Sequence, residues 1–469
     1  MAMVTGAAAA GALFVYAPNI FSAIFGLLGL YRVFSLARIL RRQMHDVYLR
    51  KATRRSTEGI LLMQAVVLTA WWAWSNWHTT GHATWAAITI VQAVFAATLF
   101  LSVVRTLRRT TWPLQKKHYA DTELPSITVA IPARDETEDL RQCLQSLIAT
   151  DYPKLEIIAL DDCSQSKRTP EIIRQFAHDG VRFIQGEQPD PSWLPKNQAY
   201  DRLVKEASGS LILFCGVDLR FAPHSLRAMV TVMLDRKKDM LCVLPRRSQA
   251  AVGRFSLIQA MRYWWELAPP RRQLKRPPVL SSCWMIRKEA LHDVGGFAAV
   301  RRAIVPEAHF ARSVGSTDGY SFLRCTDGLG IESTKSVTEQ RQTAIRMRYP
   351  QLHRRPGQVA VASLWETTFL LMPFVLAIGG AWLPIGPVAH IASIAASFFL
   401  IATYEASVLA TRVNTWWFGL IGQPLAVITD LVLIHYSMWR YEFSTVDWKG
   451  RNVCVPVMHV IPKLPKVDN

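Results

Sequence analysis

The chain has 469 residues, of which 50% are hydrophobic and only 19% charged, and its mean hydropathy of +0.13 indicates a membrane protein that carries a soluble part. The formal net charge of +19 calls for an anionic partner, and because the basic residues concentrate beside apolar runs, a bilayer surface is expected and nucleic acid is not. The seven cysteines form no C-x-x-C pair, which argues against a disulfide framework or a zinc cluster.

Residues 1–125 are predicted to form an N-terminal membrane region with about three transmembrane helices. The apolar runs Ala7–Tyr31, Gly59–Trp77 and Thr84–Val104 each have the length that a bilayer requires. The first run lacks a preceding basic segment, so we expect an anchor rather than a cleaved signal. Strongly basic stretches follow the first and third runs, and the positive-inside rule therefore places both stretches in the cytoplasm.

Residues 126–340 have the pattern of a soluble α/β domain. The runs SITVAIPA, LEIIALDD and LILFCGV are typical of short buried strands, and TEDLRQCLQSLIA and PEIIRQFAHD have helical spacing. Alternating strands and helices predict a mostly parallel sheet with helices on both faces. Ligands of such sheets gather at the carboxyl ends of the strands, so functional residues are expected there.

A second membrane region is predicted after this domain. Residues 341–358 are basic and aromatic, as in an interfacial amphipathic helix. Residues 359–438 hold three apolar segments, and 439–469 form a basic tail. Three full crossings would leave this tail outside the cell, so two or three segments are expected to span. The last, 416–438, is the best candidate for a re-entrant or interfacial segment.

Acidic residues follow three of the predicted strands. Asp135 lies just past the first, Asp161 and Asp162 end the second, and Asp218 follows the third, while Lys196 opens a helix. Each residue alone is typical of a turn or a cap. Acids at the carboxyl ends of neighbouring strands would, however, face one common crevice.

The ordered motifs IPARDE, LDDCS, WLPKNQA, VDLRF and VGGF, with WKGR near the C-terminus, resemble those of family-2 inverting glycosyltransferases of the GT-A fold. The resemblance covers residues 126 to about 348 and is greatest to the membrane-bound subgroup that glycosylates lipids, such as the hopanoid- and carotenoid-associated transferases. It implies a nucleotide-diphosphate-sugar donor, a lipid acceptor and a divalent metal, Mg²⁺ or Mn²⁺. Together with the apolar runs and the basic stretches beside them, it predicts an integral inner or plasma membrane protein with its catalytic domain in the cytoplasm.

The resemblance assigns donor binding to the strand-end residues. Asp135 and Asp162, with Asp161 close by, are suited to accept hydrogen bonds from the base and the ribose. The Lys196 ammonium is suited to the diphosphate, although a solvated lysine on a helix face is the alternative. Asp218 is the expected metal ligand.

The metal motif of this chain departs from the family. Relatives have Asp at both ends of the motif that contains Asp218, whereas this chain has Gly216 at the first position. A Mg²⁺ ion can still rely on one carboxylate, the diphosphate and water. The sequence therefore predicts a metal site with a single protein carboxylate.

The general base is expected in VPEAHFARSVG. Helical spacing aligns Glu307 with the catalytic acid of the family, behind Pro306. His309 is a second candidate, because an unperturbed histidine side chain exchanges protons near neutral pH. The alternative is that Glu307 only stabilises the start of a helix electrostatically.

Two further residues are candidates for donor or acceptor contacts. Trp284 could stack on a sugar, although an aromatic residue in a buried strand is more often core. Arg346 could contact donor phosphates, or simply belong to an amphipathic helix. The Q-x-x-R-W element of polymer-forming relatives is poorly matched around Arg346.

The predicted function is transfer of one sugar from a nucleotide-diphosphate donor to a lipid, or other membrane-associated, hydroxyl with inversion. A processive polysaccharide synthase is one alternative. A catalytically impaired nucleotide-binding membrane protein is another, because Gly216 and Glu307 depart from the family at catalytic positions.

Overall fold

The structure is a computed structural model, and it describes residues 77–110, 119–190, 192–247, 261, 264–269, 277–409, 419–443 and 446–452. The predicted apolar run at 7–31, nearly all of the run at 59–77, the first basic stretch and the tail beyond residue 452 lie outside the described residues. The expectations for those segments stay predictions.

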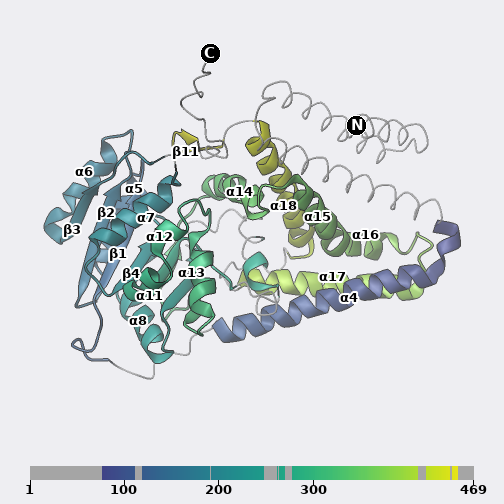
Figure 1. The fold of residues 1–469 in the computed structure, drawn as a ribbon. Coiled ribbons are helices and arrows are strands. Elements are labelled where there is room, and N and C mark those ends of the chain that lie inside the picture. The colour runs from purple at the N-terminus through teal and green to yellow at the C-terminus, as the bar shows by residue number, and fades with distance from the viewer. Residues whose placement is uncertain are drawn as a thin grey trace, which may run out of the picture.

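The centre of the described domain is a seven-stranded sheet in the order β3-β2-β1-β4-β8-β6-β9 (Figure 1). Neighbouring strands are parallel except where β8 pairs with β4 and β6. The prediction of a mostly parallel sheet is therefore confirmed. The strands are β1 (Ile127–Ala133), β2 (Leu155–Asp161), β3 (Val181–Gln185), β4 (Leu211–Cys215), β6 (Met240–Leu244), β8 (Cys283–Arg287) and β9 (Tyr320–Arg324).

Helices cover both faces of this sheet, as predicted. Successive side chains of a strand point to opposite faces, and Val129 and Ala130 of β1 accordingly belong to two different hydrophobic clusters. One cluster contains buried residues of α5 (Glu138–Ile148), α6 (Arg168–Gln175) and α8 (Ser225–Asp235). The other contains those of α7 (Pro195–Glu206), α11 (Lys288–Asp293), α12 (Gly296–Ala299) and α13 (Pro306–Gly315).

A small three-stranded sheet lies at the carboxyl end of β4. It is formed by β5 (Leu219–Phe221), β10 (Ile331–Ser333) and β7 (Arg246–Arg247). In this pairing Ser333 lies opposite Leu219, the residue that follows Asp218. The small sheet therefore brings the segment before α14 (Val337–Gln351) to the edge where ligands are expected.

Long apolar helices pack beside the domain. They are α4 (Trp77–Thr110), α15 (Pro356–Glu366), the π-helical segment η2 (Thr367–Leu371), α16 (Met372–Gly379), α17 (Pro387–Leu409) and α18 (Gly419–Phe443). Within the described residues, three helical stretches are long and apolar enough to cross a membrane: His82–Thr110, Pro356–Gly379 and Pro387–Leu409. Figure 1 shows α4 and α17 side by side, and their residues are in contact.

The segment predicted as one interfacial helix, residues 341–358, is divided between α14 and α15. α14 begins earlier, at a capping box in which Ser336 and Glu339 satisfy each other's backbone N–H groups. It ends before His353 and Arg354, which have φ angles of 55° and 53°, and Pro356 then opens α15. Left-handed residues followed by proline explain the break.

The C-terminal WKGR motif forms a hairpin, β11 (Asp447–Trp448) and β12 (Arg451–Asn452). Its two turn residues, Lys449 and Gly450, have φ angles of 48° and 73°. Positive φ at both central residues is what a two-residue hairpin turn requires, and glycine adopts it without steric cost.

Candidate active site

The acidic residues follow strands that are neighbours in the sheet. β1 pairs in parallel with β2 and with β4, and Ala133 at the end of β1 lies opposite Asp161. Asp135, Asp161 and Asp218 therefore follow strand ends at the same edge of the sheet, where the sequence placed them.

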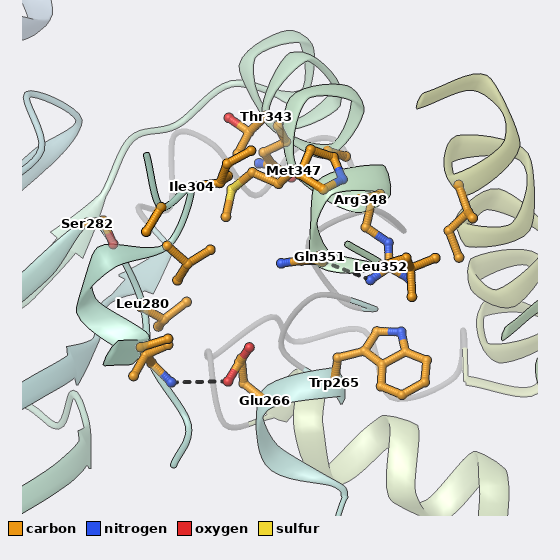
Figure 2. Close-up of a pocket in the computed structure, with 18 of the residues that line it drawn as sticks. Trp265, Glu266, Leu280, Ser282, Ile304, Thr343, Met347, Arg348, Gln351 and Leu352 are labelled. Carbon is orange, nitrogen blue, oxygen red and sulfur yellow. Dashed lines mark hydrogen bonds between the residues drawn. The ribbon is translucent and has the colours of Figure 1, made fainter. Parts of the chain in front are cut away.

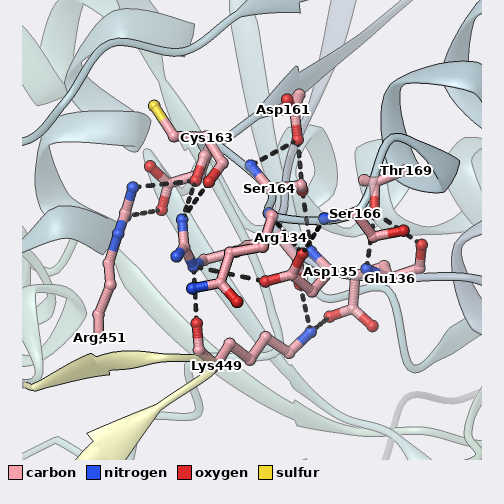
Figure 3. Close-up of polar contacts among 12 residues, drawn as sticks. Arg134, Asp135, Glu136, Asp161, Cys163, Ser164, Ser166, Thr169, Lys449 and Arg451 are labelled. Atoms are coloured by element: carbon pink, nitrogen blue, oxygen red, sulfur yellow. Dashed lines mark hydrogen bonds and ion pairs between the residues drawn. The ribbon is translucent and has the colours of Figure 1, made fainter.

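Asp135 and Asp161 are joined by the loop after β2 (Figure 3). Asp135 Oδ1 accepts hydrogen bonds from the backbone N–H groups of Gln165 (2.7 Å) and Ser166 (3.0 Å). The Ser164 hydroxyl accepts from the Asp135 N–H at 2.9 Å and donates to Asp161 Oδ1. Asp135 has a φ of 46°, a conformation that few residues other than glycine adopt and that is often found at functional sites.

The WKGR hairpin packs on this loop and provides basic groups. Arg451 donates to the Asp162 carboxylate at 2.7 Å and to the Asp162 carbonyl at 3.0 Å. Lys449 Nζ donates to the Arg134 carbonyl at 2.7 Å and pairs with Glu136, while Arg134 Nε donates to the Lys449 carbonyl at 3.0 Å. The sequence did not predict Arg451 or Lys449 as site residues. The WKGR motif was the sequence feature that could have identified them.

The basic hairpin compensates for the burial of two carboxyl groups. Burial raises the pKa of Asp162 above its ordinary value, and the hydrogen bond and positive charge of Arg451 act against this rise. Burial likewise raises the pKa of Glu136, with Lys449 acting in the opposite direction. The hairpin therefore favours the charged form of both groups.

Asp218 lines a large cavity. Its Oδ2 accepts a hydrogen bond of 2.9 Å from Ser333, on the small sheet. A Cβ atom added at Gly216 would lie 2.6 Å from Asp218 Oδ1. The Asp218 carboxylate thus occupies the space that a second acid at position 216 would need.

Of residues 216–218, only Asp218 has a carboxylate that could bind a metal. Within the described residues, no group of three or more His, Cys, Asp or Glu side chains could hold a metal ion. Asp218 fits the single-carboxylate arrangement in which Mg²⁺ keeps its waters and binds substrate phosphates.

The cavity has a volume of about 880 Å³ and lies between the domain and the apolar helices (Figure 2). Leu280 and Ser282 beside β8 form part of one wall, and Met347 and Arg348 of α14 form part of another. Its lining includes Asp218 but not Asp135, Asp161, Asp162 or Lys196. The strand-end loop and the cavity are therefore separate parts of the candidate site.

The two candidate bases differ in position. Glu307 is the second residue of α13 and its side chain is fully buried; Oε1 accepts a hydrogen bond from Ser281, and Oε2 has no partner among the described residues. Its neighbours Val305 and Ala308 line the cavity. Neither Glu307 nor His309 lines the cavity, and His309 is exposed. Glu307 is the buried one of the two and bonds to Ser281, whose neighbours Leu280 and Ser282 line the cavity.

Lys196 is the second residue of α7, where the helix N-terminus favours anions. Its Nζ lies 5.2 Å from the centroid of the Tyr200 ring. Leu194, which precedes the helix, lines the cavity. Lys196 is thus near the cavity without being part of its wall.

The two remaining candidates do not line the cavity. Trp284 is fully buried and stacks on Phe214 with ring centroids 4.0 Å apart, as a core residue does. Arg346 is half-buried on α14, and its carbonyl accepts a hydrogen bond from Tyr441 at 2.8 Å. Arg348, two positions later, lines the cavity instead.

The sequence has recognisable relatives. Residues 128–295 match the family model described as Glycosyl transferase family 2. Over 142 residues, 29% of this chain and 31% of the relative, the chain is 31% identical to "Probable glycosyltransferase YdaM" of Bacillus subtilis. It is 30% identical over 105 residues to "Glycosyltransferase AglE" of Haloferax volcanii, covering 22% of this chain and 32% of the relative.

A third relative is the "Ceramide glucosyltransferase" of Komagataella phaffii, 29% identical over 89 residues, 18% of this chain and 17% of the relative. The chain thus aligns with only part of each of these three proteins. Among solved structures, the mannosyltransferase PcManGT of Pyrobaculum calidifontis, in complex with GDP-Man and Mn²⁺, matches with a TM-score of 0.42 at 16% identity, covering 73% of this chain and 99% of the other.

The family match spans β1, β2, β4 and β8, and with them Asp135, Asp161, Asp162, Lys196 and Asp218. The named relatives are glycosyltransferases, and the carboxylates follow the strand ends that the family resemblance predicted. The match to the Glycosyl transferase family 2 model, over residues 128–295, therefore includes the strand ends and these candidate residues.

Proposed function

We propose that the protein is a membrane glycosyltransferase that moves one sugar from a nucleotide-diphosphate-sugar donor to a lipid hydroxyl, with inversion. One observation carries this proposal. The edge of the sheet that bears the acidic residues adjoins a cavity whose other wall includes residues of a helix long and apolar enough to cross a membrane. A soluble donor and a hydrophobic acceptor would approach this cavity from opposite sides.

The strand-end loop suits the nucleoside. Asp135 and Asp161 each use one carboxylate oxygen to hold the loop, and a carboxylate has further acceptor sites for base and ribose donors. Asp162 is held in place by Arg451. Lys196, at the start of α7, would provide positive charge for the diphosphate.

Asp218 would hold the divalent metal, Mg²⁺ or Mn²⁺. When bound there, the ion would neutralise charge that develops on the leaving diphosphate. The Ser333 hydroxyl fixes the direction of the Asp218 carboxylate, and Gly216 leaves room for it.

Glu307 is the proposed general base. In an inverting displacement the acceptor oxygen bonds to the anomeric carbon, the bond to the diphosphate oxygen breaks, and its electron pair leaves with the nucleoside diphosphate. The acceptor hydroxyl proton passes to the base. Burial of Glu307, its hydrogen bond to Ser281 and the position of Ser282 in the cavity wall support this role.

Exposed apolar side chains support the membrane assignment. Val94 on α4, Ile378 on α16 and Ile391 on α17 are 62%, 71% and 67% exposed. Apolar surface on several long helices is typical of a lipid-facing belt. The name of the ceramide glucosyltransferase relative agrees with a lipid acceptor. We further propose that residues 126–340 form a cytoplasmic domain and that the protein belongs to the lipid-glycosylating subgroup.

The test uses the full chain in phosphatidylcholine nanodiscs, with UDP- and GDP-sugars, Mn²⁺ and a bacterial lipid extract. We expect release of nucleoside diphosphate together with a singly glycosylated lipid. Glu307→Gln should abolish turnover and retain donor affinity, whereas Glu289→Gln, an exposed carboxylate of α11, should change neither.

Three outcomes would contradict the proposal. Products that grow in length would identify a polysaccharide synthase. Donor binding without turnover in the wild type would identify a nucleotide-binding protein. Full turnover by Glu307→Gln would remove the proposed base.

A further inference from the structure

The end of the cavity nearest the apolar helices contains an unusual charged cluster. Glu366, the last residue of α15, and Asp430 of α18 both line the cavity, and so does Arg348. Arg348 forms an ion pair with Asp430, which also accepts a hydrogen bond of 2.9 Å from Trp265 Nε1. These residues come from four separate segments of the chain.

Glu366 differs from Asp430 in having an unsatisfied carboxylate. Its side chain is fully buried, and neither oxygen has a hydrogen-bond partner within the described part of the chain. Within the described residues, the Arg348 guanidinium forms an ion pair with Glu366, with Nη2 3.7 Å from Oε1. That guanidinium already serves Asp430 and donates to Gln351 at 3.3 Å. A buried carboxylate without donors is costly, so its retention in a cavity wall points to a ligand that donates to it.

The backbone beside Glu366 is also irregular. The π-helical segment η2 follows Glu366 directly, and such segments are frequent at functional sites. Pro373 lacks the N–H group that would bond to the carbonyl four residues earlier, which accounts for a disturbed helix here. Gln92 of α4 donates to the Thr368 carbonyl at 2.7 Å, and Gln423 of α18 to that of Leu370 at 3.5 Å. Glutamine side chains from two other helices therefore hold η2 in place.

We propose that this end of the cavity binds the uncharged, hydroxyl-bearing head group of the acceptor lipid, with Glu366 as its main hydrogen-bond acceptor. This inference rests on the proposed function, because it assigns the acceptor of the same site. Leu280, Ile304 and Met347 add apolar surface to the wall of this cavity.

The charges of the cluster select for hydroxyl groups. Two carboxylates share one guanidinium, so an anionic head group such as a phosphate would be repelled. A quaternary ammonium head group has no N–H or O–H group, so it cannot donate a hydrogen bond to Glu366. Hydroxyl groups donate to carboxylates without bringing charge, and such charge-assisted bonds are stronger than neutral ones.

Asp218 and Glu366 line the same cavity from different elements, the turn after β4 and the end of α15. In this proposal the reacting hydroxyl group lies beside Asp218 and a second hydroxyl group, which orients the lipid, is held at Glu366. The acceptor would then carry at least two hydroxyl groups.

The test measures binding of 1-O-dodecylglycerol, dodecyl phosphate and dodecyltrimethylammonium to the full chain in phosphatidylcholine nanodiscs, from the rise in unfolding temperature with ligand concentration. We expect saturable binding of the alkylglycerol only. Glu366→Gln should weaken it about tenfold, as expected when a charge-assisted hydrogen bond becomes a neutral one. Glu366→Asp, which keeps the charge and withdraws the carboxylate, should weaken it as well and provides a second variant if the first does not fold.

Glu405→Gln is the matched control. Glu405 lies on α17, its carboxylate oxygens also have no hydrogen-bond partner among the described residues, and it does not line the cavity. Its substitution should leave alkylglycerol binding unchanged. Equal affinity of wild type and both Glu366 variants, or preference for either charged amphiphile, would overturn the inference.

Failure of the inference can be separated from failure of the proposed function. Sugar transfer by a wild type that binds all three amphiphiles alike would overturn only the head-group assignment. Absence of nucleotide-sugar turnover, with alkylglycerol binding that depends on Glu366, would overturn the transferase and support the binding site.

Discussion

Arg451 and Asp162 are 289 positions apart in the chain, yet the Arg451 guanidinium donates to both the carboxylate and the carbonyl of Asp162. A hairpin that follows the apolar helices in the chain therefore packs against the strand-end loop at the start of the domain. This contact makes the C-terminal WKGR motif a component of the candidate donor site.

Removing the Arg451 charge should change the pH dependence of donor binding. Burial raises the pKa of Asp162 and Arg451 opposes it, so Arg451→Gln should raise that pKa further. Asp162 accepts hydrogen bonds best when ionised, and binding is therefore lost as pH falls through its pKa. We expect the acidic limb of UDP affinity to move to higher pH in the variant. Arg202→Gln, at a surface ion pair with Glu206, is the control, and coincident pH profiles for Arg451→Gln and wild type would refute the assignment.

Gly216→Ala tests the single-carboxylate metal site. The added Cβ would lie 2.6 Å from Asp218 Oδ1 and must displace that carboxylate. We expect the Mn²⁺ concentration for half-maximal turnover to rise about fivefold, equivalent to about 1 kcal/mol. Gly315→Ala, whose Cβ would meet its nearest atom at 3.6 Å, is the matched control. An unchanged Mn²⁺ titration would argue against metal binding at Asp218.

Trp284 is expected to matter for stability rather than for sugar binding. Because it is fully buried against Phe214, Trp284→Ala should lower the free energy of unfolding by about 3–5 kcal/mol. Trp284→Phe retains an aromatic ring and should retain donor affinity. Denaturant unfolding and UDP-sugar binding measure the two effects. Loss of affinity in a stably folded Trp284→Phe protein would instead support a substrate contact.

The ionised Glu156 side chain is expected to make a pH-dependent contribution to the free energy of unfolding. Burial acts to raise its pKa, but hydrogen bonds from Thr128 and Ser208 outweigh this and hold the pKa below its ordinary value of 4.5. The stabilisation is therefore fully present above about pH 4.5 and is lost as pH falls through the lower pKa of the folded state.

Glu156→Gln should lower the unfolding temperature by roughly 2 °C at neutral pH, and the difference from wild type should shrink below about pH 4. Glu171→Gln, an exposed carboxylate of α6, provides the control. A difference that is constant across this pH range would exclude the proposed ionisation.

The local parts of the site could be predicted from the sequence. Apolar runs of five to seven residues define β1, β2 and β4. Because these strands pair in parallel, the acidic residues at or just after their carboxyl ends lie at the same edge of the sheet. Helical spacing likewise placed Glu307 at the start of α13, and the structure buries it while it exposes His309. In each case the signal lies within a few residues.

Contacts between distant segments could not be predicted in this way. The burial of Trp284 follows from antiparallel pairing of β8 with β4, which sets Trp284 opposite Phe214. Arg348 and Asp430 meet across 82 positions, and Glu366 lies within an apolar run that gave no sign of a polar partner. Periodicity identifies elements, but it does not say which charged residues of different elements become neighbours.

One hydrophobic cluster extends from the sheet into the apolar helices. It contains Leu99 of α4, Leu244 of β6, Leu400 of α17 and Val427 of α18, residues from before, within and after the domain. Shared packing of this kind fixes the orientation of the sheet relative to α4 and α17. If those helices cross the bilayer, the reaction centre is held at a constant height above it. The domain then does not move towards or away from the bilayer. Which lipids can be glycosylated would depend on whether their hydroxyl group extends far enough from the bilayer to enter the site.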